Sequence, residues 1–142
     1  MTWKSYELDR VAQKLVLSAR ERDPDSMNQS HKMRMSVAYG LERFWGEHLR
    51  LASGNKKENL EVAKSKYWKD TWDAFCGVME DAGILLPKDT VDLKNSEASK
   101  KIEEVSKKLW SLSIEDQRVA IAVLTQLCDC LVWWTQRYKI GK

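Results

Sequence analysis

One apolar stretch, residues 119–134, constrains the fold more than any other part of the sequence. Its apolar side chains cover most of the circumference of a helix, so such a helix has to be covered on several sides. The preceding "SIED", residues 113–116, has the spacing of a capping box and predicts that a helix begins there and runs to about Tyr138. These apolar residues are Val119, Ile121, Ala122, Val123, Leu124, Leu127, Cys128, Leu131, Val132 and Trp134. We expect this helix at the centre of a helical bundle or at the seam of a larger assembly.

The rest of the sequence also favours helices. Proline occurs only at positions 24 and 87 and glycine six times among 142 residues, a composition typical of long helices and not of turn-rich sheets. The length fits one domain, and 43% hydrophobic residues are enough for a core. We therefore predict an all-α protein in which residues 1–142 form a single-domain bundle of about five helices, with the apolar C-terminal helix at its centre.

Apolar residues at three-and-four spacing predict where these helices lie. The ranges are 5–22, 27–52, 60–82, 97–112 and 114–138. Pro24 ends the first helix, and Gly83 can end the third by adopting a left-handed conformation. Between the third and fourth helices we expect an irregular link whose aliphatic residues, Ile84, Leu85 and Leu86, fold back onto the bundle.

Residue types that support catalysis or metal binding are scarce. The chain has two histidines and three cysteines, no glycine-rich phosphate loop and no ligand spacing that zinc favours. Cys128 and Cys130 lie about 200° apart around a helix, so they cannot easily bridge each other or share a metal. We expect no enzyme activity, no cofactor and no bound metal.

The location of the protein follows from similar reasoning. No positively charged start followed by an apolar run occurs near Met1, which predicts a cytoplasmic protein with reduced thiols. The apolar stretch 119–134 is shorter than a membrane span and includes Thr125, Gln126 and Asp129. We interpret it as a core helix and expect no contact with a membrane.

Charge is distributed unevenly along the chain. Residues 28–69 contain nine basic and four acidic residues, whereas residues 70–99 contain two basic and seven acidic residues. This pattern predicts a basic face and an acidic face on one small body. In "KSKYWK" lysines flank Tyr67 and Trp68, a combination that suits a groove for a nucleic-acid strand, because cations bind phosphates and aromatic rings stack on bases. The alternative is that the aromatic residues belong to the core and the lysines to a solvated face.

The C-terminal stretch "LVWWTQRYK" raises a similar question. Trp133 points about 100° away from Trp134 around a helix, so both can be buried only if the helix is covered almost all round. Tryptophan, arginine and tyrosine are the residue types that dominate interface hot spots. We therefore expect one face of this stretch in the core and the other on a partner surface.

One pattern offers an enzymatic alternative. In "RFWGEH" Arg43 precedes His48 with a spacing that resembles the arginine and histidine signature of HEPN ribonucleases, in which the pair works across a dimer. In that family a polar residue usually follows the arginine, whereas Phe44 follows it here. We interpret His48, which lies on the apolar stripe, as a hydrogen-bonded core or interface residue and keep the ribonuclease as a minor alternative.

The whole chain resembles the small-subunit family of CRISPR effector complexes in its overall pattern, carried by "HKMR", "NKKEN", "KSKYWK" and "WWTQRYK". That family consists of helical bundles that contact one another and help to hold guide RNA and target strand through phosphate contacts. The resemblance implies a subunit-contact role for Trp133, Arg137 and Tyr138. It also implies a nucleic-acid-binding role for Lys32, Arg34, Arg43, Arg50, Lys56, Lys57, Lys64, Lys66 and Lys69.

Two functional hypotheses therefore stand side by side. The leading one is a non-catalytic subunit of a ribonucleoprotein complex, with RNA or single-stranded DNA, other protein subunits and further copies of itself as partners. The alternative is a protein-interaction module, an adaptor or an inhibitor, that uses the aromatic face near Trp133 and the acidic residues 70–92 and binds no nucleic acid.

Overall fold

The computed structural model describes residues 5–52 and 59–139, and the regular structure within those ranges is entirely helical. The all-α prediction is confirmed, but a count of about five helices is too low. Two short 3-10 helices, η1 (Pro24–Asn28) and η2 (Val37–Tyr39), flank the second of six α-helices. The α-helices are α1 (Ser5–Arg22), α2 (Gln29–Ser36), α3 (Leu41–Ala52), α4 (Asn59–Asp81), α5 (Ala98–Trp110) and α6 (Ile114–Lys139).

The helix predicted over residues 27–52 is interrupted, and this accounts for the difference in number. Gly40 has a φ of 97°, in the left-handed region that glycine adopts without steric cost, and its N–H donates to the Val37 carbonyl at 3.0 Å. The chain therefore turns between α2 and α3. Periodicity missed the break because Val37, Leu41 and Phe44 are all buried, so the apolar pattern continues across the turn.

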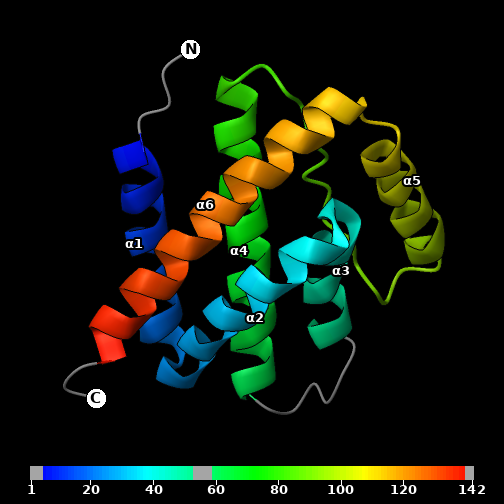
Figure 1. The fold of residues 1–142 in the computed structure, drawn as a ribbon. Helices are drawn as coiled ribbons and strands as arrows, with labels where there is room; N and C mark the ends of the chain where they lie inside the picture. The colour runs from blue at the N-terminus through cyan, green and yellow to red at the C-terminus, as the bar shows by residue number, and fades with distance from the viewer. Residues whose placement is uncertain (1–4, 53–58, 140–142) are drawn as a thin grey trace.

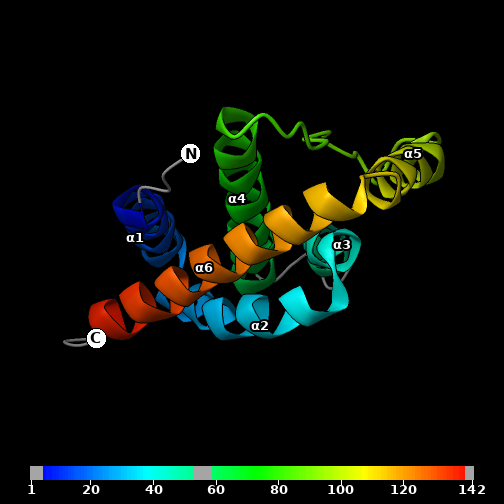
Figure 2. The ribbon, with the colours of Figure 1, turned by 45° about the horizontal axis from the view of Figure 1, so that its top comes forward.

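Helix α6 crosses the whole molecule diagonally, with α1 and α4 on one side and α2 on the other (Figures 1 and 2). Helix α3 packs against α4, and α5 stands at the edge far from α1, where it packs chiefly on α3. Leu124, Leu127 and Leu131 of α6 are fully buried. The central position predicted for this helix is confirmed, but one face remains open to solvent, where Val119 is 41% exposed.

Among the described helices, α6 alone has the length and hydropathy that crossing a membrane would need, and 39% of its most apolar window is buried inside the protein. Its contacts with α1, α2 and α4 make it a core helix of this fold. Length and composition alone are weak evidence for a membrane span, because a core helix has the same properties.

Aromatic residues from α3 and α4 fill the other half of the core. Trp45, Tyr67, Trp68 and Trp72 are at most 1% exposed, so the aromatic residues of "KSKYWK" belong to the core and not to a surface groove. Buried hydroxyl groups join three helices, since Ser30 Oγ lies 2.5 Å from Tyr67 Oη and 2.6 Å from Thr135 Oγ1. These bonds tie α2 to both α4 and α6.

The irregular link between α4 and α5 follows the prediction in part. Gly83 has a φ of 85° and ends α4 as expected. Ile84 and Leu86 are buried, but Leu85 is 76% exposed, so the expectation that all three aliphatics fold back is wrong for Leu85. An extended segment turns successive side chains to opposite sides, so the middle residue faces solvent.

Candidate nucleic-acid interface

Seven of the nine cationic residues predicted to bind nucleic acid lie in the described ranges, and these seven do not gather on one face. Lys56 and Lys57 lie outside the described residues. Lys32 and Arg34 are two residues apart on α2, about 200° around the helix, so they point in different directions. The others come from α3 (Arg43 and Arg50) and α4 (Lys64, Lys66 and Lys69).

Most of these cations have a carboxylate partner. The ion pairs are Arg34–Asp129 at 2.6 Å, Arg50–Glu47 at 2.5 Å, Lys64–Glu61 at 3.1 Å, Lys66–Asp70 at 2.9 Å and Lys69–Asp73 at 2.7 Å. Basic and acidic side chains therefore mix on α4, where each of these lysines lies one turn from its carboxylate partner. A phosphate that bound these lysines would have to compete with the carboxylates.

Lys32 and Arg43 differ from this group. Both are exposed, and neither has an ion-pair partner among the residues that the structure describes. The Arg43 guanidinium carbon lies 5.6 Å from the centre of the Tyr39 ring. These two cations are therefore free to bind an external anion.

A different part of the surface combines an aromatic ring with cations. Helix α2 lies along the C-terminal half of α6, because Ser30 bonds Thr135 and Arg34 pairs with Asp129 (Figure 1). Trp133, one turn beyond Asp129, is 55% exposed. The Arg137 guanidinium lies 5.9 Å from the centre of the Trp133 ring. We call Arg34, Asp129, Trp133 and Arg137 the α6 patch.

The neighbouring aromatic residues point inward. Trp134 packs against the core and stacks on Tyr138 with ring centres 5.9 Å apart. The Tyr138 hydroxyl accepts a hydrogen bond from Gln13 Nε2 at 3.0 Å, which joins α6 to α1. The prediction that the two tryptophans divide between core and surface is confirmed. Of the three residues assigned to subunit contact, Trp133 and Arg137 are exposed, whereas Tyr138 is half-buried and bonded within the fold.

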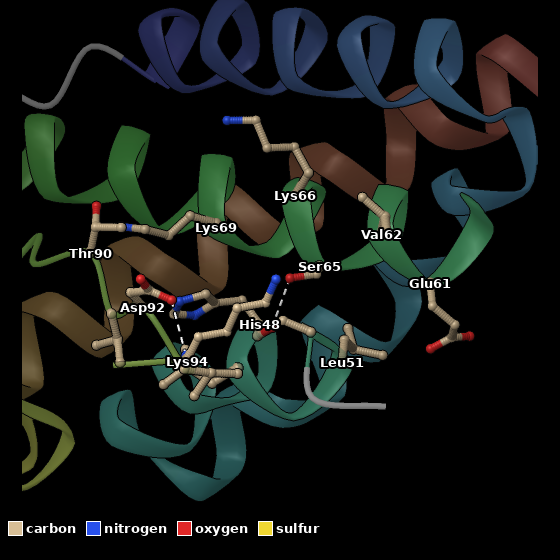
Figure 3. Close-up of a pocket in the computed structure, with 14 residues that line it drawn as sticks. His48, Leu51, Glu61, Val62, Ser65, Lys66, Lys69, Thr90, Asp92 and Lys94 are labelled. Atoms are coloured by element: carbon tan, nitrogen blue, oxygen red, sulfur yellow. Dashed lines mark hydrogen bonds between the residues drawn. The ribbon is translucent and has the colours of Figure 1, made fainter. Parts of the chain in front are cut away.

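Arg43 and His48, the pair that resembles a ribonuclease signature, do not meet within the chain. His48 is 6% exposed, and its Nδ1 donates to the Trp45 carbonyl. Burial lowers the pKa of His48, which keeps the ring neutral at physiological pH. His48 lines a cavity of about 460 Å³ between α3, α4 and the link to α5 (Figure 3). Arg43 lines a separate groove beside Tyr39 and Trp110.

The three cysteines are unpaired, and the pKa of each thiol is raised. Burial and nearby Asp73 raise the pKa of Cys76 to about 12, and burial with a hydrogen bond to Asp9 raises that of Cys130 to about 12. Their thiols therefore stay protonated at neutral pH, and a thiol must lose its proton to bind a metal or act as a nucleophile. No group of three or more histidine, cysteine, aspartate or glutamate residues converges on a metal site in the described ranges.

Comparison with known proteins adds no relative from which a function could be transferred. No family model matches the sequence, and neither the curated proteins nor the solved structures contain a match.

Proposed function

We propose that this protein is a non-catalytic helical subunit of a ribonucleoprotein complex, in which the α6 patch binds an RNA or single-stranded DNA strand without reading its sequence. The observation that carries the proposal is the exposed Trp133 ring beside the Arg137 guanidinium. An exposed aromatic ring can stack on any base, and a neighbouring cation can bind the phosphate next to it.

Helix α2 supports this assignment because it contributes the cation Arg34 to the patch. Residues 29–36 contain no acidic residue. Asp129 is the nearest opposing charge, at 2.6 Å from Arg34. Both side chains of this pair are exposed, 44% and 61%, so the pair is weak and a phosphate can displace the carboxylate. Asp129 thus competes with a phosphate for Arg34 and weakens strand binding at the proposed site.

The direct test is the affinity of the purified protein for labelled single-stranded RNA and DNA of mixed sequence across a salt series. We expect binding that weakens steeply as salt increases, because each phosphate contact releases condensed counterions. Affinities for different sequences should be similar. Absence of binding at low salt, or binding that salt does not affect, would contradict the proposal.

Replacing Asp129 with asparagine should tighten strand binding, because Arg34 would lose its competing carboxylate and become available to a phosphate. We expect an affinity gain of about threefold to tenfold at low salt, and a salt slope steeper by roughly one contact. Asp81→Asn is the matched control, since it removes the same charge from an exposed site at the end of α4. Equal gains in both variants would mean that only net charge matters and that the α6 patch is not the site.

A second function, a protein-interaction module, is favoured by a different observation. Tyr39 and Trp110, 69% and 68% exposed, line a groove of about 300 Å³ together with Arg43. This groove suits a protein segment that presents an apolar side chain beside a carboxylate for Arg43. Binding of a protein partner that is lost in Trp110→Ala but survives Arg34→Glu and high salt would favour this function over strand binding.

A further inference from the structure

The cavity beside His48 has the properties of a binding site for a small molecule. Its volume of about 460 Å³ lies within the range of roughly 300 to 1,000 Å³ that is typical of ligand pockets. Three separate segments form its walls, namely the end of α3, the first half of α4 and residues 90–94 of the link. Six of the fourteen lining residues are aliphatic, Leu51, Val62 and Leu93 among them. This aliphatic wall suits a ligand with an apolar body.

Most of the polar groups around the cavity are already bonded to other residues. Ser65 Oγ donates to the His48 carbonyl at 2.7 Å. The Lys69 ammonium is held by Asp73 at 2.7 Å, and Lys66 pairs with Asp70 and points away from the opening (Figure 3). Ser65 and Lys69 are therefore held within the fold, and Lys66 is directed away from the cavity.

Lys94 is different. Its side chain lies at the opening beside His48 and Asp92 (Figure 3), and its ammonium has no ion-pair partner among the described residues. Asp92 accepts a hydrogen bond from the Lys94 backbone N–H at 3.0 Å, so part of its acceptor capacity is used. Burial lowers the pKa of His48 and so favours its neutral ring, which leaves Lys94 and Asp92 as the charges beside it at this opening. Neither Asp92 nor Lys94 has an ion-pair partner among the described residues, but Asp92 already accepts a hydrogen bond, whereas the Lys94 ammonium has no such contact there.

We propose that this cavity binds a small amphipathic acid, with its apolar body between Leu51, Val62 and Leu93 and its carboxylate on the Lys94 ammonium. This site is separate from the α6 patch, and its existence does not depend on strand binding. The negative charge of Asp92 repels the ligand carboxylate and so lowers the affinity of the site for it.

Calorimetric titration with three probes that share one tail tests the proposal. Octanoate, 1-octanol and octylamine differ only in the charge of the head group. We expect octanoate to bind about tenfold more tightly than octanol, since a hydrogen bond to a charged group contributes about that factor. Octylamine should bind most weakly. Octylamine binding as tightly as octanoate, or no binding of octanoate at millimolar concentration, would overturn the proposal.

Two pairs of variants locate the site. Val62→Trp should abolish octanoate binding by filling the cavity, whereas Val119→Trp, also at an exposed valine but on α6, should not. Lys94→Gln should weaken octanoate about tenfold and leave octanol unchanged, whereas Lys100→Gln on α5 should change neither. If Val62→Trp or Lys94→Gln behaves like its control, the assignment of this cavity is wrong.

The same variants separate this site from the proposed function. Val62→Trp leaves the α6 patch intact, so its affinity for single-stranded RNA should equal that of the unaltered protein. Loss of octanoate binding with unchanged RNA binding would support two independent sites. Octanoate binding that persists in Val62→Trp overturns only the cavity proposal, and absence of RNA binding in the unaltered protein overturns only the proposed function.

Discussion

Trp68→Ala should lower the free energy of unfolding by about 3–5 kcal/mol, the range for removal of a large buried aromatic side chain. Trp68 is 1% exposed and lies 4.9 Å from Phe44, centre to centre. Its Nε1 donates to Gln29 Oε1 at 2.9 Å, and Gln29 is 2% exposed. The substitution therefore leaves a cavity between α3 and α4 together with a buried amide oxygen that has lost its donor. Urea unfolding followed by circular dichroism measures the change.

Two further variants divide this loss into its parts. Trp68→Phe keeps most of the apolar volume but removes the hydrogen bond to Gln29, so it should cost about 1–3 kcal/mol. Trp110→Ala is the matched control, because Trp110 is 68% exposed, and it should change stability by no more than about 0.5 kcal/mol. If Trp68→Ala costs no more than Trp110→Ala, the packing described for the α3–α4 core is incorrect.

Trp133→Ala should weaken single-stranded RNA binding by about tenfold to a hundredfold. Stacking of one base on an aromatic side chain contributes about 1–3 kcal/mol, and Trp133 is the exposed ring of the α6 patch. The loss should be similar for different sequences and at different salt concentrations, because stacking releases no counterions. Fluorescence anisotropy with labelled RNA measures the affinity, and Trp133→Phe should retain part of it.

Arg137→Gln separates stacking from phosphate contact at the same patch. It should reduce the slope of log affinity against log salt by roughly the value of one phosphate contact. Trp133→Ala should leave that slope unchanged. Trp110→Ala again serves as the control, since it removes an exposed tryptophan that lies at the end of α5, outside the α6 patch. RNA affinity that falls equally in Trp110→Ala and Trp133→Ala would assign the effect to general surface hydrophobicity and contradict a site at the α6 patch.

Local signals in the sequence were sufficient for several elements. The three-and-four spacing of Ala63, Tyr67 and Phe75 places α4 almost to the residue, because one face of that helix is buried along its length. Gly83 ends α4 as its residue type suggests, and Ser113 Oγ accepts from the Asp116 N–H at 3.0 Å at the start of α6. Each of these features depends on residues close together in the chain.

Features that depend on distant residues could not be predicted in this way. Arg34 and Asp129 are 95 positions apart, so a charge count along the chain could not show that they form a pair. The cavity requires residues 90–94 to return against α3 and α4, and the sequence of that link carries no periodic signal. The burial of Trp68 could not be predicted for the same reason, because lysines on both sides are compatible with either a solvated face or a binding groove.

The contact between α1 and α6 has a consequence for how the protein is made. Gln13 and Tyr138, which form a hydrogen bond, are separated by 125 residues, and the apolar face of α1 packs on α6. The part of that face that α6 covers therefore stays open until the ribosome has synthesised α6, although α4, which is made earlier, also contacts α1. At roughly 5–20 residues per second this interval lasts on the order of ten seconds. During that time the nascent chain exposes part of an apolar helix face to other proteins, which makes it a candidate for binding by a ribosome-associated chaperone.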